Sequence, residues 1–278
     1  MRVASIRIYP VKATGPVELT TAAVELAGLR DDRRWAVVDP HGRRLNATTH
    51  DRLLSITATP DDSGALTLTR PGESSLLVPV PHGGREIPVD VTRLTTMIDA
   101  GEPAAGWLSR VLGEPVRLAW QDDPARRPIA QQHGGRGDEP LSLADTGPLL
   151  LTTTASLAQL DAWIAEDHEP QPMVMGRFRP NVVLDGSDEP FAEDGWRTIR
   201  IGDVEHRFAE LCDRCVVTTI DPETLVHGKE PIRTLARHRR WDGKTWFGVR
   251  IVPLTAGRIS VGDPVSVVQA SNRSQTYP

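Results

Sequence analysis

The first half of this chain consists of short stretches in which apolar and polar residues alternate. Examples are residues 5–10 (SIRIYP), 53–60 (LLSITATP) and 65–72 (ALTLTRPG), each bounded by Gly, Pro, Asp or Ser. A period of two is typical of β-strands, because successive side chains of a strand point to opposite faces. Turn sequences at residues 39–42 (DPHG) and 61–64 (DDSG) separate the stretches. The pattern predicts a meander of antiparallel strands.

Helical periodicity is confined to a few segments. Residues 102–113 (EPAAGWLSRVLG) carry Pro103 in the first turn and Gly113 as the stop signal. A second helix is expected after the apolar strand at 149–151, and a short third one over 230–240 (EPIRTLARHRR). Most of the remaining second half, including 216–221 (VVTTID), resembles strands. The chain is therefore predicted to be mainly β with α (α+β).

One long polar segment interrupts this pattern. Residues 121–140 (QDDPARRPIAQQHGGRGDEP) are rich in Gly and Pro and contain no apolar run. A segment of this length inside a compact chain is usually a linker, a lid or a binding loop. Because 278 residues are enough for one large or two modest domains, we expect two, with boundaries at 1–120 and 121–270.

Charge and hydropathy exclude several classes of partner. The formal net charge is −5, and the chain has no long basic block outside residues 237–240, so we expect no nucleic-acid partner. The first residues, MRVASIRIYPVK, alternate apolar and polar residues, and no run of about 18 apolar residues follows them. We therefore expect a soluble, cytoplasmic protein with no membrane partner.

The chain has two cysteines, Cys212 and Cys215, three positions apart. A structural zinc site needs four ligands at close spacing, and an iron–sulfur cluster usually needs four thiolates. A redox pair of the thioredoxin type should stand near a βαβ pattern, whereas the β-branched residues after Cys215 favour a strand. Both thiols could also be ordinary buried residues.

Asp213 and Arg214 between the cysteines are a poor setting for two adjacent core positions. A thiol beside Arg214 would have its thiolate form favoured by the positive charge. Such a thiolate could be a nucleophile, or one ligand of a metal whose other ligands belong to a cofactor.

A second candidate site lies where the strand at 149–151 meets the next helix. Thr153 and Thr154 stand at this junction, where a hydroxyl can cap the helix. The free N–H groups of a first helical turn attract anions, so the junction is a candidate anion site.

Several separated motifs together resemble one family. They are residues 211–225 (LCDRCVVTTIDPETL), 228–239 (GKEPIRTLARHR) and 247–267 (FGVRIVPLTAGRISVGDPVSV). This part resembles the C-terminal part of MOSC-domain proteins, in the branch that contains the mitochondrial amidoxime-reducing component. Residues 8–19 (IYPVKATGPVEL), 28–39 (GLRDDRRWAVVD) and 176–186 (GRFRPNVVLDG) are similar to the same branch. The resemblance implies an N-terminal β-barrel domain followed by a MOSC β-barrel domain.

The resemblance also implies a cofactor and the residues that bind it. The family binds the molybdenum cofactor, a pterin dithiolene that ends in phosphate, with one cysteine thiolate on the metal. By position, the metal ligand and catalytic residue is Cys215. The other cofactor-binding residues that the resemblance implies are Lys12, Arg33, Thr153, Thr154, Ser156, Arg179, Asn181, Asp213, Arg214 and Arg250.

Three positions depart from the family pattern. Ala13 stands where the family commonly has Ser, and Thr154 stands where an acidic residue is frequent. Arg250 lies near a position that is often aromatic. These departures affect the expected substrate preference more than the expected cofactor.

The implied activity is the reduction of N-hydroxylated small molecules, such as amidoximes or hydroxylamines, by a molybdenum-dependent oxidoreductase. The chain has no Gly-x-Gly-x-x-Gly motif and too few cysteines for a cluster, so we expect electrons from a separate reductase or ferredoxin-like partner. Two alternatives stay open: a sulfur transferase that uses a Cys215 persulfide, and a non-enzymatic protein that binds or delivers the cofactor.

Overall fold

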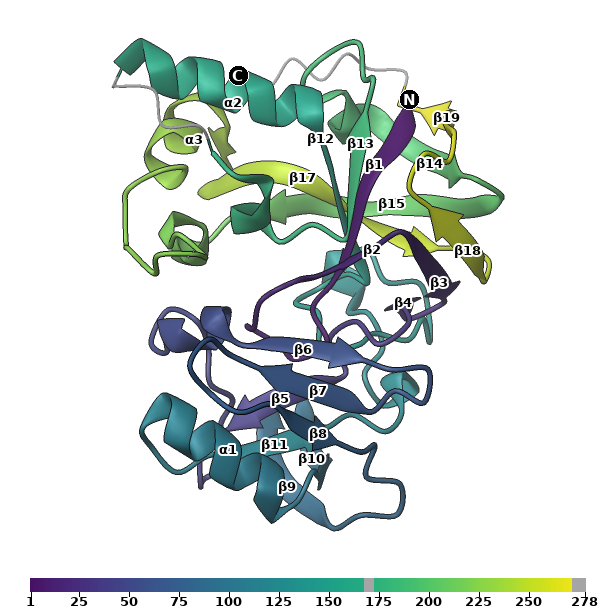
Figure 1. Ribbon diagram of the computed structural model, residues 1–278. Coiled ribbons are helices and arrows are strands. Elements are labelled where there is room, and N and C mark those ends of the chain that lie inside the picture. The colour runs from purple at the N-terminus through teal and green to yellow at the C-terminus, as the bar shows by residue number, and fades with distance from the viewer. Residues whose placement is uncertain (168–172, 272–278) are drawn as a thin grey trace.

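The structure is a computed structural model that describes residues 1–167 and 173–271. Figure 1 shows two halves, one above the other, joined by several crossings of the chain. Strands dominate both halves, which confirms the mainly β prediction. Within the described residues, no helix is long and apolar enough to cross a membrane.

The upper half is built on one nine-stranded mixed sheet. Two neighbouring strands in its interior, β12 and β13, are parallel, with Leu151 opposite Val182, and the other neighbours are antiparallel. The path across the sheet runs β19 (Val265–Ala270), β14 (Trp196–Ile201), β15 (Val204–Asp213), β17 (Lys244–Pro253), β12 (Leu149–Thr153), β13 (Val182–Asp185), β1 (Arg2–Ile8) and β2 (Val17–Leu19), with β16 (Arg240–Trp241) paired to β17. Helices α2 (Thr154–Asp167) and α3 (Ile232–His238) lie at the edge of this half.

The lower half contains two smaller antiparallel sheets and one helix. One sheet consists of β5 (Trp35–Val38), β11 (Arg117–Trp120), β10 (Leu94–Asp99) and β9 (Glu86–Val91), and the other of β6 (Thr57–Pro60), β7 (Leu66–Thr69) and β8 (Leu76–Val78). Helix α1 (Glu102–Leu112) packs Trp107, Leu108 and Val111 into their shared core. It ends at Gly113, whose φ of 82° is left-handed, as the stop signal predicts.

The two cores are interleaved along the chain rather than consecutive. Strand β1 pairs with β13, with Ile6 opposite Val182 and Val3 opposite Leu184, so it belongs to the upper sheet. Strand β3 (Thr21–Glu25) likewise pairs with β18 (Gly257–Ser260) and with β4 (Gly28–Leu29). The lower core then draws on Val11 and on residues from Trp35 to Leu118.

The sequence-based placement of the first strand is therefore wrong. The alternation of apolar and polar residues correctly predicted a strand with one buried face. The strand was expected to belong to the meander of the first half, but a period of two does not say which other strand a strand will pair with. Strands β1 to β4 pack with the upper half, so packing crosses residue 120, and the division into 1–120 and 121–270 stays a prediction.

Removing side-chain volume from β1 should destabilise the upper sheet. Ile6 is fully buried among Leu184, Val182 and Ile8, so we expect Ile6→Ala to lower the free energy of unfolding by about 2–5 kcal/mol. Val268→Ala, in an edge strand and 51% exposed, should change it by less than about 0.5 kcal/mol. Urea denaturation measures both. Equal effects would mean that β1 does not pack into the sheet core.

Candidate functional site

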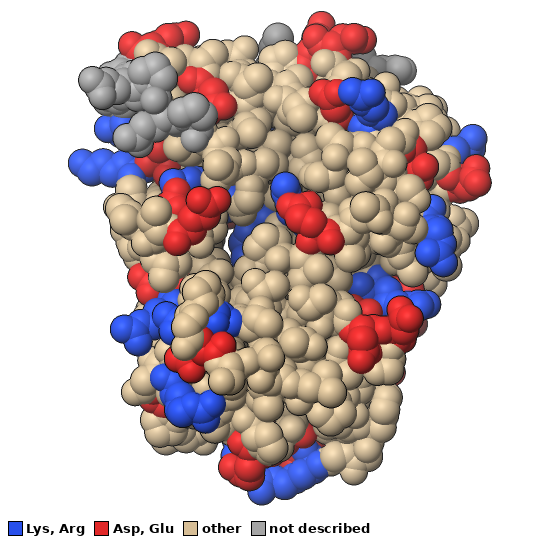
Figure 2. Space-filling view, in the orientation of Figure 1, with Lys and Arg blue, Asp and Glu red and all other residues tan. Residues whose placement is uncertain are grey.

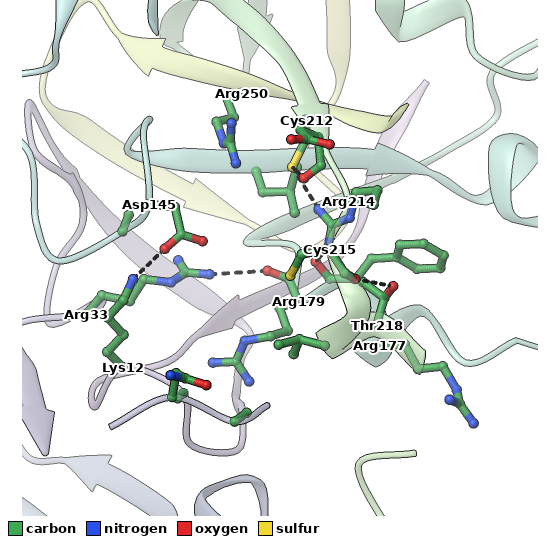
Figure 3. Close-up of a pocket in the computed structure, with 18 of the residues that line it drawn as sticks. Lys12, Arg33, Asp145, Arg177, Arg179, Cys212, Arg214, Cys215, Thr218 and Arg250 are labelled. Atoms are coloured by element: carbon green, nitrogen blue, oxygen red, sulfur yellow. Dashed lines mark hydrogen bonds and ion pairs between the residues drawn. The ribbon is translucent and has the colours of Figure 1, made fainter. Parts of the chain in front are cut away.

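A cavity of about 470 Å³ lies at the junction of the two halves. Figure 2 shows a hollow there with Lys and Arg side chains inside it, and Figure 3 shows the wall in detail. The volume is in the range of small-molecule sites, about 300–1,000 Å³. Seven of its lining residues are cationic and two, Asp145 and Asp213, are acidic; the cations are Lys12, Arg33, Arg44, Arg177, Arg179, Arg214 and Arg250.

The cysteine loop forms one wall of this cavity. Strand β15 ends at Asp213, and the backbone N–H of Arg214 donates to the carbonyl of Thr245 at 2.8 Å. The chain then turns sharply through a 3₁₀ turn, Val216–Thr219, whose first carbonyl, that of Cys215, accepts from the Thr218 hydroxyl at 2.9 Å. The strand expected over residues 216–221 is therefore wrong, because the threonine hydroxyls bond back to the chain and close a turn.

The two thiols occupy different environments. Cys215 is exposed and lines the cavity, and no hydrogen-bond partner of its sulfur is found among the described residues. Cys212 is buried, and its sulfur accepts from Nη1 of Arg214 at 2.7 Å. A second contact, from Nη2 of Arg214 to the carbonyl of Phe178 at 2.8 Å, holds the guanidinium in place. Cys212 thus fixes an arginine, while Cys215 is left available.

The opposite wall comes from the segment that leaves β1. The backbone N–H of Lys12 donates to the carbonyl of Trp35 at 2.7 Å, and that of Arg33 donates to the carbonyl of Tyr9 at 3.0 Å. These bonds bring Lys12 and Arg33 side by side although 21 residues separate them. The side chain of Arg33 bonds to Asp32, and to Oδ1 of Asn181 at 3.0 Å.

Lys12 has an unusual charge environment. Its Nζ donates to the carbonyl of Leu143 at 2.7 Å and to Asp145 at 2.6 Å, with only 9% of its side chain exposed. Burial lowers the pKa of Lys12 to about 8, although Asp145 opposes that shift. The Lys12 charge in turn holds the pKa of Asp145 well below its usual range. Lys12 can therefore gain or lose a proton near neutral pH.

Arg179 lies beside Arg33 without a carboxylate of its own. Its Nη1 donates to the carbonyl of Thr14 at 2.7 Å, and its guanidinium stacks on the Tyr9 ring, 4.1 Å from the centroid. Burial, followed by repulsion from Arg33, lowers the pKa of Arg179 to about 10. Both arginines have left-handed backbones, with φ of 57° and 52°. Such conformations are unfavourable for residues other than glycine and cluster at ligand sites.

The charge balance of the wall is incomplete. Lys12, Arg33, Arg177 and Arg250 are paired with Asp145, Asp32, Asp221 and Glu210. For Arg44, Arg179 and Arg214, the described residues provide no carboxylate within ion-pair distance. Arg179 and Arg214 are half-buried and Arg44 is exposed, so seven like charges that line one cavity, three of them without a nearby carboxylate, favour an anionic ligand there.

Eight of the predicted site residues line the cavity: Lys12, Arg33, Arg179, Asn181, Asp213, Arg214, Cys215 and Arg250. Thr153, Thr154 and Ser156 do not. Leu150 reaches the cavity wall, and the chain runs away from it along β12 to the start of α2. The hydroxyls of Thr153 and Ser156 contact the buried carboxyl of Glu193, at 3.3 and 2.7 Å, and Thr154 bonds to Asp185. The helix start thus holds carboxyls of the chain, and we do not include it in the site.

Three charged residues of the site were missed by the sequence reasoning. Arg177 lies two residues before Arg179 in GRFRPN, and Arg44 ends the basic turn HGRR, so each had a neighbouring signal. Asp145 had none, because its role depends on Lys12, which lies 133 residues away.

Comparison with known proteins assigns the family. A model described as the MOSC domain matches residues 138–266, and one described as the MOSC N-terminal beta barrel domain matches residues 1–115. Human mitochondrial amidoxime-reducing component 1 is 34% identical over 286 residues, which cover 95% of this chain and 82% of that protein. The chain belongs to the MOSC family.

Two further relatives of this MOSC protein differ in how much of their length it spans. Human mitochondrial amidoxime reducing component 2 is 30% identical, again with 95% of this chain and 82% of that protein covered. Zebrafish molybdenum cofactor sulfurase is 30% identical over 265 residues, covering 90% of this chain but 31% of that protein. The MOSC protein is thus similar to the amidoxime-reducing components over most of their length, and to the sulfurase over less than a third.

The buried carboxyl beneath α2 should make stability depend on pH. Burial raises the pKa of Glu193 to about 7, although its hydrogen bonds oppose the shift. The pKa in the folded protein exceeds the usual value of about 4.3. Glu193 therefore makes its full contribution to the free energy of unfolding below about pH 4.3, and this contribution is lost as the pH rises through about 7.

In wild type, we therefore expect the free energy of unfolding to fall by up to about 1.4 kcal/mol per pH unit as the pH rises through this window. Glu193→Gln, which mimics the protonated acid, should not show this fall. The measurement is urea denaturation from pH 5 to pH 8, with Glu205→Gln, a partly exposed carboxyl on β15, as the control. Parallel stability curves for wild type and Glu193→Gln would show that Glu193 does not titrate there.

Proposed function

We propose that this MOSC protein binds the molybdenum cofactor in the cavity and reduces N-hydroxylated small molecules with electrons from a separate donor protein. The observation that carries the proposal is one exposed, unengaged thiol beside seven cations that line the same cavity, three of which have no carboxylate partner among the described residues. The similarity to amidoxime-reducing components over most of their length supports the choice of reaction.

Cys215 would hold the metal. A thiolate is the soft ligand that suits molybdenum bound to a dithiolene, and Cys215 reaches the cavity from a tight turn with its sulfur unengaged. Cys212 is less suited, because it is buried and its sulfur already accepts from Arg214. One protein ligand leaves room at the metal for a substrate.

The cationic wall would hold the pterin and its phosphate. Phosphate is bound by guanidinium groups through charge-assisted hydrogen bonds, often in pairs. Arg44, Arg179 and Arg214 offer such groups without competing carboxylates. Oδ1 of Asn181 accepts from Arg33 and, at 3.1 Å, from the backbone N–H of Leu150. Asn181 therefore holds the Arg33 side chain in the cavity wall. These residues therefore fit the group by charge and by donor type.

When bound, the cofactor supplies two-electron redox chemistry that no side chain of the protein offers. The reduction of an N-hydroxyl group to an amine-type nitrogen and water takes up two electrons and two protons. Lys12 Nζ is suited to hold one of these protons, because its pKa of about 8 lets it donate at neutral pH and Asp145 fixes its direction. The cavity opens at the surface as a hollow (Figure 2), so a small-molecule substrate can enter it.

A sulfur transfer reaction is the alternative to reduction. An exposed Cys215 could carry a persulfide, and the molybdenum cofactor sulfurase is a relative. That similarity covers less than a third of the sulfurase, and a persulfide alone would not require the uncompensated cations. Delivery of the cofactor to another protein would use the same cavity but no turnover.

Replacing the proposed metal ligand should separate these functions. We expect near-stoichiometric molybdenum in protein from a cofactor-producing host, turnover of benzamidoxime with a chemical reductant, and loss of at least about 90% of that turnover in Cys215→Ser, because an alcohol is a harder and less easily ionised ligand than a thiol. Elemental analysis and steady-state kinetics measure both quantities.

Cys212→Ala is the matched control, because it removes the neighbouring thiol and leaves Cys215 in place. It should keep most of its molybdenum and lose about 1 kcal/mol or somewhat more of stability. Full turnover by Cys215→Ser would contradict the proposal. A persulfide on Cys215 without metal would favour sulfur transfer, and bound metal without turnover would favour delivery.

A further inference from the structure

Arg250 reaches the cavity from a strand next to β15, which carries Cys212 and leads to Cys215. It lies on β17 opposite Glu210 of β15, two residues before Cys212. Its guanidinium lines the cavity and, in Figure 3, points into it on the Cys212 side. Nη1 donates to Oε1 of Glu210 at 2.7 Å, and no partner of Nε or Nη2 is found within residues 1–167 and 173–271. The Nε and Nη2 groups of the Arg250 guanidinium are therefore free to donate to a ligand.

Glu210 holds this guanidinium in one orientation and is itself held on both oxygens. Oε1 also accepts from the Thr146 hydroxyl, and Oε2 lies 3.0 Å from Nδ1 of His133. Burial alone would raise the pKa of Glu210, but these hydrogen bonds and the Arg250 charge lower it below its usual value. Glu210 is therefore a carboxylate at neutral pH, and it shares its charge between Arg250 and two other groups.

The long polar segment of residues 121–140 provides the outer support for this arrangement. A Cβ on Gly134 would lie 2.6 Å from the carbonyl oxygen of Ala209, and one on Gly135 would lie 2.1 Å from that of Ile129. Gly134 therefore packs directly on β15, and at Gly135 the segment folds tightly on itself, with no room for a side chain at either position. The ion pair between Glu139 and the buried Arg207 fixes its other end. His133 is thereby placed beside Glu210, so the segment is a brace and not a free linker.

The stem of Arg250 is positioned as well. A Cβ on Gly147 would lie 3.0 Å from Cβ and 3.1 Å from Cδ of Arg250. Because residue 147 has no side chain, the aliphatic part of Arg250 packs directly on the backbone there, and this contact fixes where the guanidinium enters the cavity. The stem, one Nη and the counter-charge are all fixed, which is costly in side-chain entropy unless the remaining N–H groups serve a ligand.

We propose that Arg250 recognises an anionic substituent, a carboxylate, on the substrate, and that Glu210 positions it and attenuates its charge. The inference rests on the proposed reductase function and specifies its substrate class: N-hydroxylated compounds that also carry a carboxylate. The free Nε and Nη2 groups of one arginine can bind the two oxygens of one carboxylate, which carries a single negative charge. The cofactor phosphate has better partners in Arg44 and Arg179, which lack carboxylates. Arg250 instead stands beside the cysteine strand, where a substrate must bind to reach the metal.

Two substitutions should move this selectivity in opposite directions. Arg250→Gln removes the charge but can still donate to Glu210. Glu210→Gln keeps an acceptor for Thr146 and Arg250, and its amide can donate to Nδ1 of His133, so the geometry is retained while the attenuating charge is lost. Arg200→Met, which removes an exposed arginine paired with Glu205 outside the cavity, is the control.

The experiment uses cofactor-loaded protein and two matched probe pairs. Calorimetry compares the binding of benzoate with that of benzamide, and steady-state kinetics compare kcat/KM for 4-carboxybenzamidoxime with that for benzamidoxime. We expect wild type to prefer the anionic member of each pair. Arg250→Gln should lower that preference about tenfold or more, Glu210→Gln should raise it severalfold, and Arg200→Met should leave it unchanged. The change should appear in KM rather than in kcat.

Equal preference in wild type, or an unchanged ratio in Arg250→Gln, would overturn the inference. A parallel loss for anionic and neutral probes in Glu210→Gln would show that Glu210 is only structural. A fall in molybdenum content in Arg250→Gln at unchanged probe selectivity would assign the anion to the cofactor and also overturn it. If wild type turns over neither amidoxime, the proposed reductase function fails, while the calorimetric comparison still decides whether Arg250 recognises a carboxylate.

Discussion

Repulsion among seven cationic side chains around one cavity is the constraint on which the rest of this structure depends. Four of them are neutralised by carboxylates from neighbouring segments, each in its own pair. The other three have no carboxylate partner in the described part of the chain, and burial together with Arg33 lowers the pKa of Arg179 to about 10. Like charges gathered around one cavity repel each other, so a bound anion would relieve that repulsion.

Interleaving of the two halves makes this cluster possible. Because β1 is inserted in the upper sheet, the chain crosses the junction at residues 9–12 and meets the start of β5, where Lys12 and Arg33 come together. The cysteine loop and Arg250 arrive from the other side on β15 and β17. The upper sheet therefore carries one wall of the cavity, and the segments that lead from β1 and into β5 carry the other. Two residues of the cavity wall, Arg33 and Arg179, have left-handed backbones.

Local sequence signals predicted the elements better than their partners. The first helix, its Gly113 stop and the strand character of residues 5–10 follow from periodicity and turn chemistry, which act within a few residues. The pairing of β1 with β13 could not be predicted, because the paired residues lie 176 to 183 positions apart along the chain. Residues 216–219 were misassigned because β-branched residues favour strands, whereas the hydroxyls of Thr218 and Thr219 close a turn.

The site was predictable where a motif carries it and not where it depends on packing. Cys215, Arg214 and Arg179 were found from their motifs, and the structure brings them to one cavity. Ser156 and Thr153 were expected there because a helix start attracts anions, yet a carboxyl of the chain, Glu193, occupies that position. Asp145 and the support of Arg250 by Glu210 and His133 could not be read from the sequence, because each depends on residues that are distant along the chain.

The most direct test of the central claim is the position of the metal in a crystal of the cofactor-loaded protein. Anomalous difference maps recorded on both sides of the molybdenum absorption edge locate the metal without reference to activity. A single peak in the cavity, within bonding distance of the Cys215 sulfur and with the phosphate density against Arg44, Arg179 or Arg214, is the predicted result. A peak bonded to Cys212, or a peak outside the cavity in protein whose molybdenum content is stoichiometric, would contradict it.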